Sequence, residues 1–93
     1  MPVYAVALIK IRDRAAYTKY EAGFAEICSR SSGEILSVEE APRVIEGDWP
    51  YTRTVLLRFP SDACFQAWYQ STAYQAIAQH RFGGSSAQIV LVS

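Results

Sequence analysis

The sequence has few of the residues that build metal centres, disulfide frameworks and nucleic-acid interfaces. Its 93 residues include two cysteines, Cys28 and Cys64, and one histidine, His80. The cysteines have no Cys-x-x-Cys or Cys/His spacing, which argues against a metal or disulfide scaffold and favours a reduced, cytoplasmic protein. Lysine occurs only at Lys10 and Lys19, and nine basic residues balance nine acidic ones. Because nucleic acids and anionic membranes attract a basic excess, we expect neither as a partner.

Long hydrophobic runs are absent as well. The opening MPVYAVALIKIR carries an apolar run that ends at Lys10, which is too short to span a bilayer, and no basic region precedes it. We therefore expect no signal peptide. No repeat, linker or low-complexity tract interrupts the chain. Since 51% of the residues are hydrophobic and 13% are aromatic, the composition predicts one packed domain over residues 1–93.

Four segments have the length and alternation of strands. They are Val3–Ile11, Glu34–Glu39, Arg53–Phe59 and Ala87–Val92. A further short strand or bent edge over RVIEG, residues 43–47, is an open alternative. The first, third and last strands are apolar on both alternating faces, which is unusual for a sheet with one face in water.

Helical spacing follows the first and third strands. Asp13 can cap a helix that carries apolar residues at intervals of three to four from Tyr17 to Cys28 and that Gly33 ends. Ser61 can cap a second helix with an apolar stripe of Phe65, Trp68 and Tyr69. The sequence TAYQ, residues 72–75, resembles a capping box and predicts a third helical piece that ends at Gly83-Gly84.

This order of elements predicts an α+β protein with the split βαβ, ferredoxin-like plan. Helices then cover one face of a four-stranded antiparallel sheet, and the other apolar face needs a partner. A second copy of the chain is the economical partner, so we predict a homodimer that closes into a dimeric α+β barrel. An edge-paired dimer or a tetramer would also cover that face.

The sequence resembles the domain of unknown function 1330 family, within the dimeric α+β barrel superfamily. The segments that carry the likeness run in order along nearly the whole chain: MPVYAVALIKIRD, YTKYEAGFAEI, SGEILSV, VIEGDWPYTRTVLLRFPS, AWYQSTAYQAI and IVLV. EGDW, residues 46–49, and AWYQSTAYQ, residues 67–75, are the most specific. An arginine after the last helix's apolar stripe is common in the family and corresponds to Arg81. The FGGSSAQ segment and His80 depart from the family pattern, so the resemblance supports no role for His80.

The resemblance leaves the activity open. The family has no established reaction, and its superfamily includes cofactor-free monooxygenases, small-molecule isomerases and haem-dependent enzymes. Shared fold cannot choose among these activities.

The most unusual motif contains Asp48 and Trp49. In one interpretation Gly47 to Pro50 is a turn in which the aspartate caps the backbone and the tryptophan packs over the sheet end. In the other interpretation both residues lie at the mouth of the barrel. Trp49 would form an apolar wall there, and Asp48 would act as a general base with a pKa raised by desolvation.

Arg81 and His80 have two interpretations as well. They can be solvated cations at the end of a helix, where the dipole favours positive charge. Alternatively, Arg81 binds a carboxylate or phosphate with its planar fork, and His80 transfers a proton near neutral pH. Tyr69 and Tyr74 could each add a hydroxyl to a pocket. Arg58, on an apolar strand face, needs an anionic ligand or a carboxylate partner such as Glu46 or Asp48 across the dimer.

The leading hypothesis is a cytoplasmic homodimer that binds a small, partly apolar and possibly anionic organic molecule without a cofactor or metal. Asp48 and His80 are the candidate catalytic residues for proton transfer or oxygenation. The candidate ligand-binding residues are Trp49, Arg81, Tyr69 and Arg58. The alternative is a non-catalytic structural or ligand-sensing dimer. A third hypothesis, haem binding, would require His80 as the ligand because it is the only histidine.

Overall fold

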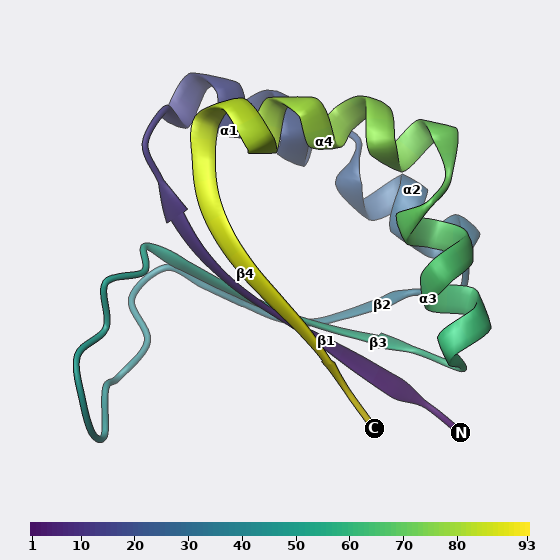
Figure 1. The fold of residues 1–93 in the computed structure, drawn as a ribbon, viewed down its shortest axis with the longest axis horizontal. Helices are drawn as coiled ribbons and strands as arrows, with labels where there is room; N and C mark the ends of the chain where they lie inside the picture. Colours follow the sequence, from purple (N-terminus) through teal and green to yellow (C-terminus); the bar gives the residue numbers. More distant parts are fainter.

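The computed structural model describes residues 1–93 and has the predicted α+β architecture, with one antiparallel sheet and helices on one of its faces (Figure 1). The strands are β1 (Val3–Ile11), β2 (Glu34–Glu39), β3 (Arg53–Phe59) and β4 (Ser85–Val92). They lie in the order β2-β3-β1-β4, and every neighbouring pair is antiparallel. This arrangement confirms the ferredoxin-like prediction.

Strand alternation decides which residues enter the core. On β1, Val3, Ala5, Ala7 and Ile9 are buried, and the residues between them are not. The register pairs Ala5 with Leu57 and Ala7 with Val55, so the buried residues of β3 lie on the same face. Directly paired residues on neighbouring strands point to the same side of a sheet. These buried residues therefore form one face, and that face packs against the buried side chains of the helices.

The first predicted helix is two helices in the structure, α1 (Arg14–Ala22) and α2 (Phe24–Arg30). Asp13 caps α1 as expected, since its side chain accepts a hydrogen bond from the Ala16 amide. The break falls at Gly23, whose φ of −110° and ψ of 1° leave the helical region. The apolar spacing continues across the break, which is why the sequence predicted a single helix.

The last two helices are α3 (Asp62–Tyr69) and α4 (Thr72–Gly84). Ser61 caps α3 as predicted, through a bond from the Cys64 amide. The predicted capping box at residues 72–75 is wrong: Ser71 is the N-cap of α4 and accepts from the Tyr74 amide. The helix ends at Gly84 as expected. Strand β4 begins directly after it, two residues earlier than predicted.

The sheet face without helices is apolar at its centre. Val6 pairs with Leu56 and with Val90, so these three side chains share a face opposite to the buried Ala5 and Leu57. Val90 is 57% exposed. Residues 40–52, between β2 and β3, form a loop, so the further short strand considered over residues 43–47 is absent. This loop projects from the sheet, away from the helical layer (Figure 1). No helix is long and apolar enough to pass through a membrane.

Candidate functional site

A cavity of about 180 Å³ lies between the helical layer and the sheet. Its floor is formed by the small and branched residues of β1 and β3, and its walls are formed mainly by aromatic side chains of the helices. Ala5 and Ala7 of β1 have small side chains, which leave space that larger residues would fill. The lining is apolar except for a few polar groups, which is the usual make-up of a small-molecule site.

Arg81 is the buried charge of this cavity. It follows Tyr74 by seven residues and Ala78 by three on α4, and this spacing places all three on the helix face that meets the sheet. Arg81 is 5% exposed. Its Nη2 donates to the Tyr74 hydroxyl at 3.4 Å, and its Nε has no hydrogen-bond partner in the protein. No carboxylate forms an ion pair with Arg81, although buried charges are normally paired.

Two tyrosines stand beside this guanidinium. The hydroxyls of Tyr20 on α1 and Tyr74 on α4 are 2.9 Å apart and buried. Arg81 also lies over the Tyr20 ring, with 5.6 Å between its guanidinium carbon and the ring centre. Burial raises the pKa of Tyr20 far above its ordinary value, and Tyr74 raises it further. Because Tyr20 stays protonated at neutral pH, this hydroxyl is a hydrogen-bonding group there and not a base.

Arg81 keeps its positive charge although it is buried. Burial lowers the pKa of Arg81, but the neighbouring Tyr74 and Tyr20 raise it by more, so the net pKa lies above the ordinary value. The cavity therefore holds a permanent, unpaired positive charge with free N–H groups. Such a group can bind a carboxylate or another oxyanion.

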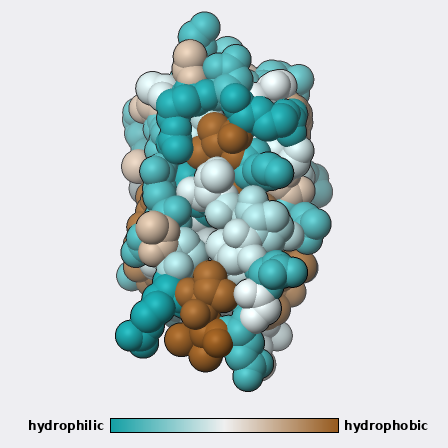
Figure 2. Space-filling view, turned by 90° about the vertical axis from the view of Figure 1, so that its left-hand side faces the viewer, coloured by the Kyte–Doolittle hydropathy of each residue, from teal (hydrophilic) through white to brown (hydrophobic).

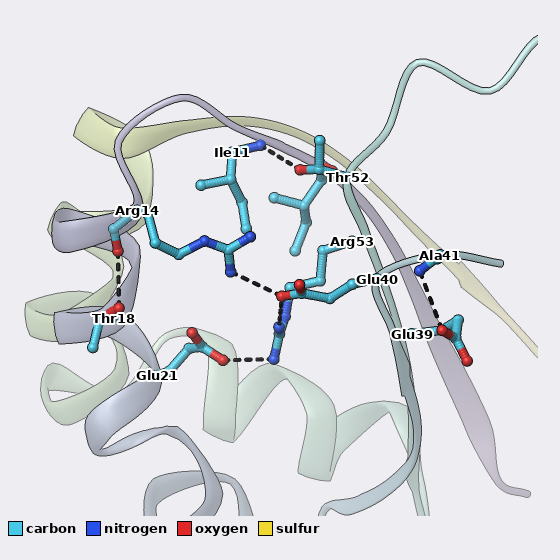
Figure 3. Close-up of polar contacts among 10 residues, drawn as sticks. Ile11, Arg14, Thr18, Glu21, Glu39, Glu40, Ala41, Thr52 and Arg53 are labelled. Carbon is cyan, nitrogen blue, oxygen red and sulfur yellow. Dashed lines mark hydrogen bonds and ion pairs between the residues drawn. The ribbon is translucent and has the colours of Figure 1, made fainter.

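A chain of ion pairs joins α1 to the sheet beside the cavity (Figure 3). Arg53, from the buried face of β3, donates to Glu21 of α1 at 2.6 Å and to Glu40 at 2.7 Å. Glu40 directly follows β2 and also accepts from Arg14 of α1 at 2.8 Å. Arg53 and Glu21 both line the cavity. These pairs tie the first helix to the base of the projecting loop, and they leave Arg53 neutralised, in contrast to Arg81.

Asp48 and Trp49 lie on the projecting loop and line neither the cavity nor its rim. Asp48 is exposed, and Trp49 is 38% exposed with its ring edge against Tyr51, 5.3 Å between centres. Gly47 has a φ of +87°, which fits the turn interpretation of this motif. Figure 2 views the molecule from the side of this loop and shows an apolar area at its lower end. Val44 and Ile45 of the loop are exposed.

The other predicted site residues are dispersed. His80 is exposed on α4, one position before the buried Arg81 and on a different side of the helix. Tyr69 lines a separate open hollow, which shares Arg81 and Ile89 with the cavity. Arg58 lies on the helix-free face, since it pairs with Tyr4, and Glu34 is 3.9 Å from it. Arg81 is thus the predicted site residue that lines the cavity, and its burial rules out the solvated interpretation.

Several residues of the cavity were not singled out from the sequence. Tyr20 and Trp68 were assigned to the core by their helical spacing, whereas Tyr74 was considered as a source of a pocket hydroxyl. Their common cavity arises from elements that are distant in the chain. Arg53 left a detectable signal: it has the same strand parity as Val55 and Leu57, so alternation places it on the buried face.

Metal and thiol chemistry find no support in the side-chain arrangement. No three His, Cys, Asp or Glu side chains gather into a group that could hold a metal ion. Burial raises the pKa of the Cys28 thiol to about 11. The thiolate is the nucleophilic form of cysteine, so this thiol is unreactive at neutral pH.

The ion pairs that Glu40 forms with Arg14 and Arg53 predict that the stability of the fold depends on pH. Hydrogen bonds from Arg14 hold the pKa of Glu40 below its ordinary value of 4.5. Because the folded-state pKa is depressed, the stabilisation is present above pH 4.5 and disappears as the pH falls through the folded-state value. We expect Glu40→Gln to melt at a lower temperature than the parent near neutral pH. The gap should close as acid protonates Glu40 in the parent.

Thermal unfolding followed by circular dichroism, from about pH 7 down to about pH 3, measures this gap. Glu46→Gln is the matched control, because Glu46 is an exposed carboxylate on the projecting loop. Its melting temperature should follow the parent at every pH. A gap for Glu40→Gln that persists in acid would contradict the assigned role of the carboxylate.

Comparisons with known proteins agree with the fold. The model of a family described as a domain of unknown function, DUF1330, matches residues 2–93. Among curated proteins, none matches the chain. Many solved structures also match the chain, among them three that superpose along nearly all of it.

The RPA0582 protein of unknown function from Rhodopseudomonas palustris has a TM-score of 0.83 at 15% identity, over 98% of this chain and 80% of that one. A dimeric ferredoxin-like protein of unknown function from Jannaschia sp. CCS1 has a TM-score of 0.75 at 12% identity, over 100% and 99% of the two chains. SnoaB, a cofactor-independent oxygenase from Streptomyces nogalater, has a TM-score of 0.71 at 13% identity, over 99% and 91%. At these identities the likeness establishes the fold alone.

Proposed function

The chain belongs to the DUF1330 family, and from that premise and its buried cavity we propose that it is a cytoplasmic homodimer that binds a small, mainly apolar organic anion in each subunit. The observation that carries the proposal is Arg81. Its guanidinium is buried beside an apolar cavity, keeps its charge, and has no carboxylate partner.

The energetics favour an anion over a neutral ligand. A buried charge without a partner is costly, and a ligand carboxylate would offset that cost through charge-assisted hydrogen bonds. The free Nε of Arg81 is a donor for such a bond. The apolar lining around it would meanwhile remove the hydrocarbon part of the ligand from water.

The homodimer is supported by the apolar sheet face. Val6, Leu56 and Val90 form a continuous patch on the face that no helix covers. A twofold dimer places the same patch of both copies in contact, so one apolar surface is enough to form the interface. The ferredoxin-like proteins from Jannaschia sp. CCS1 and Thermobifida fusca are described as dimeric, which agrees with this assembly.

Cyclohexanecarboxylate and its uncharged amide test the anion site, since they share a shape and differ in charge. We expect the carboxylate to bind about 10 to 100 times more tightly, because hydrogen bonds to charged groups contribute about 1.5–3 kcal/mol. Arg81→Met should remove this preference. Isothermal titration calorimetry gives both dissociation constants, and circular dichroism checks that the variant is folded.

Arg43→Met is the matched control, because Arg43 is an exposed arginine just before the projecting loop's tip. It should keep the preference of the parent. Equal binding of the two compounds by the parent would overturn the proposal, and so would an unchanged preference in folded Arg81→Met.

A cofactor-free enzyme is the second candidate function, and the likeness to the oxygenase SnoaB favours it. In such an enzyme Asp48 and His80 are the proposed proton-transfer residues. Asp48 lies on the projecting loop, so it would act on the cavity of a second copy. Turnover of an identified substrate that survives Asp48→Asn would remove Asp48 from this role. The alternative is a non-catalytic structural or ligand-sensing dimer, in which Asp48→Asn would change stability only.

A further inference from the structure

The polar groups around the cavity are predominantly hydrogen-bond donors. Arg81 has five N–H donors and no acceptor, and one of them, Nε, has no partner. Trp68 is 3% exposed, lines the cavity, and has a buried indole Nε1 without a partner. The carboxylate in the lining, Glu21, is already paired with Arg53. A ligand that satisfies this set must bring acceptors.

The charges around the cavity limit the ligand to one negative charge. Arg53 is matched by Glu21 and by Glu40, and Arg14 also pairs with Glu40. Arg81 alone has no ionic partner. A monoanion would neutralise it, whereas a phosphate dianion would leave one buried negative charge without a partner.

The walls of the cavity are aromatic. Rings from all four helices line it: Tyr17, Tyr20, Phe24, Trp68 and Tyr74. Several are close to one another, with ring centres 6.1 Å apart for Tyr20 and Tyr74 and 5.8 Å apart for Phe24 and Trp68, both edge to face. A further flat ring can join such a cluster in the same geometry, and an aromatic pair gains attraction beyond the area it buries.

The volume of about 180 Å³ fits one ring. A protein cavity of about 150 Å³ lined by aliphatic and aromatic residues holds one benzene molecule. The remaining volume suits a single carboxylate group, and Arg81 is among the lining residues. Drug-sized ligands need pockets of about 300 Å³ or more, so a fused polycyclic body would not fit inside.

We propose that the ligand class of this site is a single-ring aromatic carboxylate. The ring lies among the aromatic walls, and the carboxylate binds the free edge of Arg81 with the Trp68 indole N–H as a further donor. The assignment rests on the proposed anion site and names the ligand class that the site selects.

Benzoate and cyclohexanecarboxylate provide the test, because both carry one carboxylate on a six-membered ring and differ in aromaticity. We expect benzoate to bind the dimer about three to ten times more tightly in calorimetric titrations. Trp68→Phe keeps an aromatic ring and removes the N–H donor, so it should weaken benzoate binding by about three- to tenfold.

The indole N–H resonances of the unaltered protein give a second measurement that does not depend on a variant folding. Trp68 lines the cavity and Trp49 lies on the projecting loop, so each reports on a different place. Benzoate should shift the Trp68 resonance at saturation and leave the Trp49 resonance unchanged.

Each outcome separates this proposal from the anion site itself. If cyclohexanecarboxylate binds through Arg81 as tightly as benzoate does, the aromatic class is wrong and the anion site stands. A benzoate complex that leaves the Trp68 resonance unmoved would also overturn the aromatic assignment. If neither carboxylate binds, or binding does not depend on Arg81, both proposals fail.

Discussion

Replacing Gly33 by alanine is expected to destabilise the protein by about 3 kcal/mol, the upper part of the range for overpacked cores. Gly33 lies between α2 and β2, and its backbone N–H donates to the Cys28 carbonyl at 3.0 Å. An added methyl group would collide with the Cys28 sulfur and would come 2.7 Å from the ring of Phe59. Phe59 is fully buried against Phe65 and Trp68, so it has no free space into which to move.

Gly83→Ala is the matched control for this substitution. A methyl group at Gly83 meets no atom within 4 Å, and the residue lies in the last turn of α4. Alanine is the better helix former by up to about 1 kcal/mol, so the control should be as stable as the parent or slightly more stable. Urea unfolding curves give both free energies. Equal free energies of unfolding for Gly33→Ala and Gly83→Ala would contradict the close packing described around Gly33.

Placing a charge on the helix-free sheet face is expected to separate the proposed dimer. Val90→Asp puts a carboxylate in the apolar patch, beside its cross-strand partner Val6 on the same face. In a twofold interface the substitution occurs twice, and each buried carboxylate without a partner costs several kcal/mol. We expect the dimer dissociation constant to rise at least about a thousandfold.

Sedimentation velocity over a range of concentrations measures this constant. Ala63→Asp adds the same charge at an exposed position of α3, outside the sheet, and should leave the dimer intact. Circular dichroism should show that Val90→Asp is folded, because Val90 is not part of the buried core. A parent protein that sediments as a monomer, or a Val90→Asp variant that stays dimeric, would contradict this assembly.

Local patterns were enough to predict the elements of the fold. The alternation of Val3–Ile11 and Arg53–Phe59 depends on neighbouring residues only, and both strands have the predicted bounds in the structure. Caps at Asp13 and Ser61 were also predictable, because a cap involves groups three residues apart. Local patterns failed at Gly23, because the apolar spacing continues unbroken across the helix end. They also failed at Thr72, because the neighbouring Ser71 is an equally suitable cap residue and is the one that caps α4.

The candidate site was only partly accessible to the same reasoning. Arg81 was identified as a possible anion-binding residue, and its spacing from Tyr74 and Ala78 already predicts the buried side of α4. Asp48 and Trp49 attracted attention because they are adjacent in an unusual turn. Adjacency in the sequence carries no information about distance from a cavity, and the structure places both residues on the projecting loop.

The sequence by itself determined the strands, the helical segments apart from the break at Gly23, their order and the two apolar faces of the sheet, because each follows from spacing within one element. Tertiary structure alone decided the composition of the cavity. Tyr20 and Tyr74 are 54 residues apart and share a hydrogen bond only because α1 and α4 pack side by side. Tertiary structure also decided which of the two cavity arginines lacks an ionic partner. Glu21 and Glu40 pair with Arg53, and no carboxylate pairs with Arg81. Charge pairing between distant segments depends on where the whole chain places them.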